Sequence, residues 1–522
     1  MQAPQLSISG TRDYAGDDAL ALQAARDAIG ATLRRYAYAA INPPILESAL
    51  PFLNRSGEDI RRQMYIFPDP AGQELCLRPE LTIPVCRAYL RQLHGQLPGQ
   101  GAGRSVSARE ARLSYFGPAF TYETASEGRH RQFYQAGAEY IAAATREAAD
   151  AEIFAAALDC LQAAGLTQTA IEIGDVEVRN AFIDQLPIDD RSKARIRRIA
   201  LRNPNAAALA ATAGTAAVVA EETNQFGELA SLLAAAEPGK AELLIREVFA
   251  LADVRHVGGR TPEEIVERLA SRSAQQAEPI SAELIEGVVA LLNIRAAPET
   301  AFKAIREHFR KFRIGAIDAV LERCEKRLGY VEAYRDGPVA VQFNVGLRRG
   351  LDFYTGFLFE IYAKDMRQIG HVCGGGRYDN LLEGLGASEA TPAVGFGIGL
   401  DRLLLALQKA GARGADDTLK TDAFVVAVGN TPHEQCIRAA AALRAAGWAV
   451  ELDSSGRDQE SAVRYATQHK ICRVVFVSEG DLKKGQVRVR DLPGREDRAM
   501  ALSSLAADGK GDGAAEPASK RK

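Results

Sequence analysis

Charged side chains of both signs gather in a stretch that reads as a long hairpin, residues 117–137 (GPAFTYETASEGRHRQFYQAG). Aromatic and β-branched residues flank its polar loop, which predicts a strand at 117–124 and a return strand that begins at Gln132. Arg129 and Arg131 alternate in the loop and could form a clamp for a phosphate or carboxylate group. The hairpin therefore looks suited to an anion, yet its first strand carries no positive charge.

Polar residues at alternating positions suggest a pocket beside this hairpin. Gln135 and Glu139 are four apart in the return strand, so a strand presents both on one face. Glu139 interrupts the apolar run AGAEYIAAA, where a carboxylate suits a bound ammonium or imidazolium group. Upstream, Arg78, Glu80 and Thr82 alternate in LRPELTIPV and could line the same pocket if that stretch is extended. A solvent-exposed face explains the second pattern equally well.

A third candidate is the glycine-rich run CGGGRYDN at 373–380. Glycine lets a backbone approach a ligand closely. The run matches neither the dinucleotide-binding fingerprint nor the Walker loop, so it is weak evidence for a phosphate site. A tight turn before a helix is the plainer interpretation.

Composition narrows the class of protein. A chain of 522 residues is too long for one core, so we expect two to four domains. The net charge of −3 gives no general attraction to nucleic acid, although a local basic groove is compatible with it. The seven cysteines form no Cys-x-x-Cys pair, which argues against a disulfide framework or a metal cluster and favours buried, reduced thiols. Without a signal-like N-terminus or an apolar run of roughly 20 residues, we expect a cytoplasmic protein with no membrane contact.

The elements that would position these residues divide along the chain. Strands and hairpins dominate the first and third parts, an Ala-rich helical insertion without a catalytic constellation separates them, and strands alternate with helices near the end. The expected parts are 1–176 and 336–410 for a sheet-containing core, 177–335 for the helical insertion, 411–421 for a linker, 422–505 for a small α/β domain and 506–522 for a disordered tail.

Taken together, these stretches resemble the class II histidyl-tRNA synthetase family. The segments that carry the resemblance stand in the family's order: GTRD (10–13), LRPELT (77–82), the hairpin with its flanks (112–140), RRGLDFYTGFLFE (348–360), CGGGRYDNLLEGLG (373–386) and PAVGFGIGLDRLL (392–404). The segment 422–498 resembles the family's anticodon-binding domain. The resemblance implies an α+β fold, with an antiparallel sheet flanked by helices, a helical insertion and a small C-terminal α/β domain.

The resemblance also implies two adjoining sites and no metal site. The residues of the implied histidine pocket are Glu80, Thr82, Arg129, Gln135, Glu139 and Tyr354. The implied ATP-phosphate site uses the strand 117–124, Arg349 and Arg402. This assignment agrees with the charges, because carboxylates suit the amino group of histidine and arginines suit phosphates.

One position departs from the family pattern. Active histidyl-tRNA synthetases carry arginine in an FRHE-like step of the hairpin, whereas this chain has FTYE, with Thr121. Losing one preorganised group that stabilises transition-state charge costs on the order of 2.7–4 kcal/mol, about a hundred- to thousandfold in rate. Phe353 also replaces the first tyrosine of the usual DYY step. We therefore expect no catalytic residues, only a remnant of the phosphate site.

A second branch of the family fits that expectation better, namely the synthetase-like regulatory subunit of ATP phosphoribosyltransferase. LTIPV, GEDIRR and VGGRTPEEIVERLA resemble this branch. Its members are non-catalytic proteins of histidine biosynthesis, so the expected partners are the short-form catalytic subunit and L-histidine, in a homodimer within a hetero-oligomer, with tRNA unlikely. No cofactor is then needed. The C-terminal α/β domain disagrees, because most regulatory subunits lack it, although its segment LDSSGRDQESAVRYA has no run of lysines.

Two alternatives stay open. One is a histidine–tRNA ligase that charges tRNA through histidyl-adenylate and uses ATP and magnesium. The other is a synthetase-like binding protein of a different kind.

Overall fold

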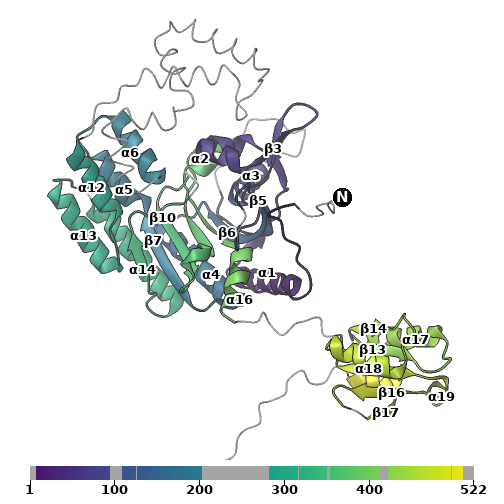
Figure 1. Cartoon of the computed structure of the whole chain (residues 1–522). Coiled ribbons are helices and arrows are strands. Elements are labelled where there is room, and N and C mark those ends of the chain that lie inside the picture. The colour runs from purple at the N-terminus through teal and green to yellow at the C-terminus, as the bar shows by residue number, and fades with distance from the viewer. Residues whose placement is uncertain are drawn as a thin grey trace, which may run out of the picture. The chain divides into compact units, whose positions relative to one another are not determined.

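The computed structural model describes residues 8–93, 109–124, 126–202, 281–315, 317–349, 353–411, 421–494 and 496–508. Most of these residues form two compact units, one within Leu22–Arg413 and the other within Gly414–Lys522 (Figure 1). Each unit has its own sheet and its own hydrophobic core. We describe them separately.

A nine-stranded sheet organises the large unit, and most of its neighbouring strands are antiparallel; only the β1–β5 and β7–β9 pairs are parallel. In sheet order the strands are β1 (Ala39–Ala40), β5 (Ala111–Phe120), β6 (Gln132–Ile141), β12 (Ala393–Gly399), β11 (Cys373–Arg377), β10 (Phe357–Ala363), β7 (Thr169–Asp175), β9 (Gln342–Asn344) and β8 (Arg295–Ala296). A small second sheet contains β2 (Leu46–Ser48), β4 (Glu74–Leu77) and β3 (Tyr65–Pro68).

Helices flank the large sheet. They are α1 (Asp17–Arg35), α2 (Leu50–Gln63), α3 (Thr82–Leu93), α4 (Arg146–Ala163), α5 (Val176–Asp184), α6 (Asp190–Arg202), α12 (Ala282–Leu292), α13 (Pro298–Lys311), α14 (Asp318–Arg335), the 3₁₀ turn η1 (Arg367–Ile369), α15 (Leu381–Gly384) and α16 (Leu400–Lys409). Helix α4 packs on one face of the sheet because its alanines are small, and its Phe154 meets the Phe359 ring of β10 edge-on at 4.9 Å. The opposite face of the central strands is left for the site described below.

The described part of the predicted helical insertion is helical except for the short strand β8, and residues 203–280 lie outside the described residues. Leu291, Phe302 and Leu321 of α12–α14 are buried in the same hydrophobic cluster as Ile173 of β7. Strand β8 also joins the sheet through β9. The helices after residue 281 therefore share the core of the large unit, while the expected boundaries at 177 and 335 stay predictions.

Two local expectations were wrong. The glycine run 373–377 is not a turn, because it forms strand β11 between β10 and β12. The strand expected at 117–124 ends at Phe120, so Thr121 follows it. Both differences arise from pairing with distant strands, which local sequence patterns do not report.

The small unit confirms the expected alternation of strands and helices. Its sheet has the order β14 (Val450–Leu452), β13 (Ala423–Ala427), β15 (Arg473–Val477), β16 (Gln486–Asp491) and β17 (Arg498–Ala501). Its helices are α17 (His433–Ala445), α18 (Gln459–Gln468), α19 (Glu479–Leu482) and α20 (Leu502–Asp508). Val425 and Phe424 of β13 enter different core clusters, so both faces of the sheet are covered. The expected linker and tail fall mostly outside the described residues.

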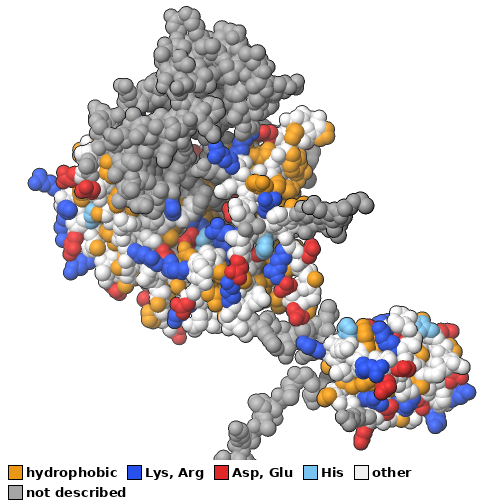
Figure 2. Space-filling view, in the orientation of Figure 1, with side chains coloured by type: hydrophobic (Ala, Val, Ile, Leu, Met, Phe, Trp, Pro, Cys, Tyr) orange, Lys and Arg blue, Asp and Glu red, His pale blue; other side chains and the backbone are white. Residues whose placement is uncertain are grey.

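Three other features concern the whole described chain. Within the described ranges, no helix combines the length and apolar character that a bilayer crossing demands. All seven cysteines are free, and all are buried except Cys472, which is exposed. Exposed hydrophobic side chains include Ile45, Leu46, Leu50 and Phe67, and Figure 2 shows hydrophobic residues gathered over the small second sheet.

Candidate functional site

The floor of the candidate site is formed by glycines of β11 and β12. A Cβ atom on Gly374 would overlap the guanidinium of Arg349, and one on Gly395 would overlap the carboxylate of Glu139. A Cβ on Gly397 would likewise overlap the side-chain amide of Gln135. Three functional side chains thus lie flat across backbone that only glycine leaves open, which explains the glycine-rich runs better than a turn does.

Glu139 is the most deeply buried carboxylate of the site. It is 0% exposed, and the Tyr378 hydroxyl donates a hydrogen bond to its Oε2 atom. The Oε1 atom is buried and has no hydrogen-bond partner. Burial raises the pKa of Glu139 to about 8, although the hydroxyls of Tyr378, Thr82 and Tyr115 oppose this shift. A buried, half-satisfied carboxylate is costly, so the geometry favours a bound cation or donor.

Glu80 provides a second carboxylate at the start of α3. It accepts hydrogen bonds from the backbone N–H of Ile83 at 2.9 Å and from that of Thr82. Burial raises the pKa of Glu80 to about 7, and its charge raises the pKa of Glu139 further. Glu80 therefore caps a helix and also contributes negative charge to the pocket.

Of the polar residues expected to line the pocket with these carboxylates, Gln135 and Arg78 differ in where the structure places them. Gln135 lies in the site, where its Oε1 accepts a hydrogen bond from Leu81 N–H at 3.1 Å. Arg78 does not, because its guanidinium donates to the carbonyls of Pro118 at 2.8 Å and Pro43 at 2.6 Å. The idea that Arg78 lines the pocket is wrong, since the chain turns into α3 at Thr82 and does not stay extended.

Two neighbouring aromatic residues, Phe353 and Tyr354, contribute to the site in different ways. Burial raises the pKa of the Tyr354 hydroxyl, the charge of Arg349 lowers it, and the charge of Glu139 raises it. Phe353 packs edge-on against Tyr378, with ring centroids 5.6 Å apart. Tyr354 therefore lies in the site as expected, while Phe353 forms part of its wall.

Three arginines form the second half of the site. Arg349 donates to the Phe359 carbonyl at 3.3 Å, and Arg402 donates to the His371 carbonyl at 2.9 Å. Burial lowers the pKa of Arg402, and the charge of Arg129 lowers it further. Positive charge is therefore in excess here, as expected of a site that binds a polyphosphate.

The predicted clamp of Arg129 and Arg131 is not formed. The guanidinium of Arg131 lies over the Tyr122 ring, 4.4 Å from its centroid, whereas Arg129 lies 3.8 Å from Glu123. Thr121 precedes Tyr122 in the chain, and its backbone N–H donates a hydrogen bond to the backbone carbonyl of Arg131 at 2.9 Å. Only Arg129 of the pair contributes charge to the arginine group.

Three further side chains of the candidate site, Tyr378, Tyr115 and His371, were not among the residues predicted from the sequence to form it. Tyr378 and His371 flank the glycine run that was read as a turn. A buried ion-pair network holds this segment in place: Arg377 is 1% exposed and contacts Asp150 at 2.6 Å and Asp379 at 2.8 Å. If CGGGR had been recognised as a strand, Tyr378 and His371 could have been placed beside the candidate site.

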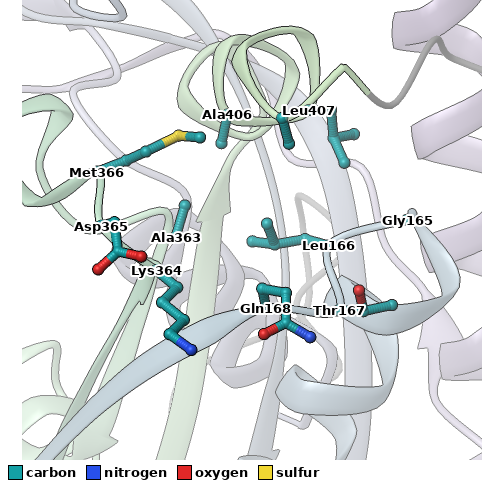
Figure 3. Close-up of a pocket in the computed structure, with 11 residues that line it drawn as sticks. Gly165, Leu166, Thr167, Gln168, Ala363, Lys364, Asp365, Met366, Ala406 and Leu407 are labelled. Atoms are coloured by element: carbon teal, nitrogen blue, oxygen red, sulfur yellow. The ribbon is translucent and has the colours of Figure 1, made fainter.

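A separate hollow of about 410 Å³ lies between the α4–β7 connection, the end of β10 and α16 (Figure 3). Leu166, Met366 and Ala406 line it, with Lys364 and Asp365 at the side of the view. None of the residues discussed above lines this hollow. Elsewhere in the described part of the chain, no cluster of three or more metal-ligating side chains occurs.

Comparison with known proteins identifies the family. A family profile described as "Histidyl-tRNA synthetase" matches residues 10–254 and 248–403, and one described as "Anticodon binding domain" matches residues 422–508. The chain is 28% identical to the histidine–tRNA ligase of Methanococcus maripaludis strain C7 over 498 residues, 95% of this chain and 97% of that protein. The histidine–tRNA ligase of Pyrococcus furiosus is 27% identical, again over 95% of this chain and 97% of the other.

Solved structures agree with the fold. The histidyl-tRNA synthetase of Nostoc has a TM-score of 0.63 at 18% identity and covers 97% of this chain and 99% of its own. A protein of Bacillus halodurans described as an ATP phosphoribosyltransferase regulatory subunit/histidyl-tRNA synthetase has a TM-score of 0.61 at 20% identity, over 91% of this chain and 99% of its own. The class II synthetase-like fold with a C-terminal anticodon-binding domain is therefore confirmed.

These matches overturn the expected function. Relatives that align along almost the whole chain are named histidine–tRNA ligases, which contradicts a non-catalytic regulatory subunit of histidine biosynthesis. They equally contradict a short-form phosphoribosyltransferase partner and the view that tRNA is an unlikely one. The error came from giving Thr121 more weight than the rest of the chain. With its sheet, its glycine-floored site and its C-terminal unit, the chain belongs to the histidyl-tRNA synthetase family.

Proposed function

We propose that this protein is a histidine–tRNA ligase, which activates L-histidine with ATP and transfers it to tRNA. The observation that carries this proposal is the alignment with histidine–tRNA ligases over 95% of the chain and 97% of those relatives. The alignment includes the C-terminal unit, for which a regulatory subunit has no evident use. The residues of the site support the same reaction.

Histidine binding is assigned to the carboxylate half of the site. Glu80 and Glu139 attract the ammonium and imidazole groups of histidine, because both are buried and the Oε1 atom of Glu139 has no partner within the chain. The Tyr354 hydroxyl interacts with the charges of these acids and with Arg349. Gln135 and Thr82 complete the proposed pocket. Arg129, which the resemblance assigns to this pocket, is grouped with the arginine half, because its charge lowers the pKa of Arg402.

Adenylate formation is assigned to the arginine half. A carboxylate oxygen of histidine attacks the α-phosphorus of ATP, the bond to the β-phosphate oxygen breaks, and pyrophosphate leaves. Arg349 and Arg402 offset the negative charge that develops on the phosphates. Magnesium arrives with ATP as part of that substrate. A ribose hydroxyl of tRNA then attacks the activated carbonyl and releases AMP.

Thr121 makes this an unusual member of the family. It adds no charge to the α-phosphate, so Arg349 has to provide more of the stabilisation. We therefore expect a working ligase whose adenylation step is slower than that of a variant carrying arginine at this position.

The deciding experiment measures histidine-dependent ATP–pyrophosphate exchange and the charging of tRNA(His) by the full-length protein. Both should occur, and Arg349→Gln should reduce exchange by a hundredfold or more. Arg438→Gln is the matched control, because Arg438 is exposed on α17 and pairs with the exposed Glu434 at 2.5 Å. A parallel phosphoribosyltransferase assay with an added short-form catalytic subunit should show no activation. Absence of both exchange and charging would overturn the proposal.

A further inference from the structure

We propose that Arg295 and Arg367 form a further phosphate-binding subsite, at the rim of the candidate site. The inference rests on the proposed function and deepens it, because the ligand is a phosphate group of a nucleotide substrate, either ATP or tRNA. Neither arginine was singled out from the sequence, where they stand far apart. The structure brings them together on one carboxylate.

That carboxylate is Glu172 of β7, which is buried. Its Oε1 atom contacts the guanidinium groups of both arginines, that of Arg295 at 2.5 Å. Its Oε2 atom accepts a hydrogen bond from the side-chain amide of Asn344 at 2.8 Å. Arg295 comes from β8 and Arg367 from the turn η1. Because both guanidinium groups touch the same oxygen atom, they lie side by side.

The charges of this cluster do not balance. Glu172 carries one negative charge, whereas the two guanidinium groups carry two positive charges. Among the described residues, no second acidic side chain pairs with either arginine. The guanidinium of Arg367 also lies over the ring of Tyr362, 4.5 Å from its centroid, which adds no formal charge. One arginine is enough to neutralise Glu172, so the second leaves an unmatched positive charge.

The arginine pair is also accessible and held in place. The side chains of Arg295 and Arg367 are 43% and 44% exposed, although the carboxylate beneath them is buried. A guanidinium has five N–H donors, and the contact with Glu172 uses only part of that set. Its planar fork suits the oxygens of a phosphate group. Because Glu172 already orders both side chains, a phosphate that binds here loses less affinity to side-chain ordering.

The register of the sheet places this pair beside the arginine half of the candidate site. Glu172 lies directly opposite Glu360 in the β7–β10 ladder, and residues opposed in this way project from the same face of a sheet. Glu360 lies 3.3 Å from the Nδ1 atom of His371, whose carbonyl accepts a hydrogen bond from Arg402 at 2.9 Å. The pair therefore extends the positive charge of the site toward the β8 edge of the sheet.

Two substrates present the required chemistry at this rim. One source is the terminal phosphates of ATP, which become pyrophosphate in the reaction. The other is a backbone phosphate near the end of tRNA that accepts histidine. Both are phosphate groups, so the subsite is defined by the same interaction in either case, and the test identifies the source.

The test measures equilibrium binding to the full-length protein, which does not depend on turnover. Calorimetry is used for ATP and for pyrophosphate, and filter binding at several salt concentrations is used for tRNA(His). Arg367→Gln keeps Arg295 as the partner of Glu172, so the fold is retained. It should weaken the binding of at least one of these ligands about tenfold, as expected for one charge-assisted contact. If the ligand is tRNA, the slope of log K against log salt concentration should also fall by about one.

Control variants separate charge from structure. Arg306→Gln is matched in exposure, but Arg306 contacts two carboxylates, Asp318 at 2.8 Å and Glu325 at 3.3 Å, and so has no unmatched charge. It should leave all three affinities unchanged. Arg367→Lys keeps the charge and should bind the affected ligand more tightly than Arg367→Gln does. Arg295→Gln is the second variant if Arg367→Gln does not fold, and it should weaken the same ligand.

The outcomes distinguish the two proposals. If Arg367→Gln and Arg295→Gln bind ATP, pyrophosphate and tRNA(His) as tightly as the wild type, the inference is overturned, and the arginines serve only to hold Glu172. The proposed function stands in that case, provided that the wild type binds and charges tRNA(His). A wild type that binds none of the three ligands would overturn both the inference and the proposed function.

Discussion

Replacing Glu139 by glutamine should stabilise the ligand-free protein at alkaline pH while weakening its hold on histidine. The substitution preserves the shape of the side chain and removes its ability to ionise. Glu139 is fully buried, and burial raises its pKa to about 8 from the ordinary 4.5. Wild-type protein therefore has to ionise a carboxylate in an unfavourable place, whereas the variant does not.

The magnitude follows from linkage. Between pH 4.5 and 8 the folded state binds this proton more tightly than the unfolded state does, so stability falls as pH rises through that window. Each pKa unit corresponds to about 1.4 kcal/mol, and the displaced pKa corresponds to about 2–4 kcal/mol lost between pH 5 and 8. Glu80 has the same sign, with a pKa of about 7, and it remains in the variant. The pH dependence should therefore be reduced rather than abolished.

Thermal unfolding at pH 6 and pH 8.5, without ligand, measures this difference. The melting temperature of Glu139→Gln should fall less between the two conditions, by several degrees, than that of the wild type. Glu172→Gln is a control at another buried carboxylate, and we expect it to have the opposite effect on the melting temperature. Glu172 pairs with Arg295 at 2.5 Å and also with Arg367, so removing its charge should lower the melting temperature at both pH values.

Calorimetry completes the assay. Histidine should bind Glu139→Gln about ten- to a hundredfold more weakly, because a charge-assisted hydrogen bond contributes roughly 1.5–3 kcal/mol. Affinity for the wild type should rise with pH between 6 and 8, as the two carboxylates ionise. A variant that is less stable than wild type at pH 8.5, or one that binds histidine equally well, would refute the reasoning.

Three further predictions follow from other parts of the large unit. Thr121→Arg should raise the rate of ATP–pyrophosphate exchange tenfold or more, and a lower rate would show that the site is adapted to a neutral side chain. Gly374→Ala should displace Arg349 and slow exchange about a hundredfold, with little change in the affinity for histidine. Gly329→Ala is the control, because the added methyl group would meet no atom within 4 Å; it should be neutral or stabilise α14 by up to about 1 kcal/mol. Leu50 is 61% exposed and lies close in the chain to the exposed Ile45 and Leu46, and we predict that this apolar surface forms a homodimer. Leu50→Asp should then convert a dimer into a monomer in light scattering, and an unchanged mass would place the interface elsewhere.

Some of the fold could be predicted because its signals are local. The hairpin of β5 and β6, the alternation in the small unit and the pairing of Gln135 with Glu139 on one face all follow from period-two patterns. The glycine run could not be read in this way. Its residues are glycine because side chains from other strands and loops occupy the space above them, and that information is not contained in the run itself.

Arginines were hard to assign for a related reason. Arg78, Arg129 and Arg131 look alike in the sequence. In the structure, Arg78 donates to backbone carbonyls, Arg129 lies close enough to Arg402 to lower its pKa, and Arg131 lies over an aromatic ring. A guanidinium has five donors and can satisfy them with groups anywhere in the fold. Only the three-dimensional arrangement shows which arginine is available to a ligand.

The expected loss of catalysis was an error of magnitude. One missing preorganised cation costs about 2.7–4 kcal/mol, while enzymes lower their barriers by about 8–23 kcal/mol in total. A chain in which Arg349, Arg402 and Arg129 all lie close enough to act on the same histidine, His371, retains most of the means to stabilise phosphate charge. Thr121 alone therefore predicts a slower reaction and a need for compensation nearby. It does not predict that the reaction has been abandoned.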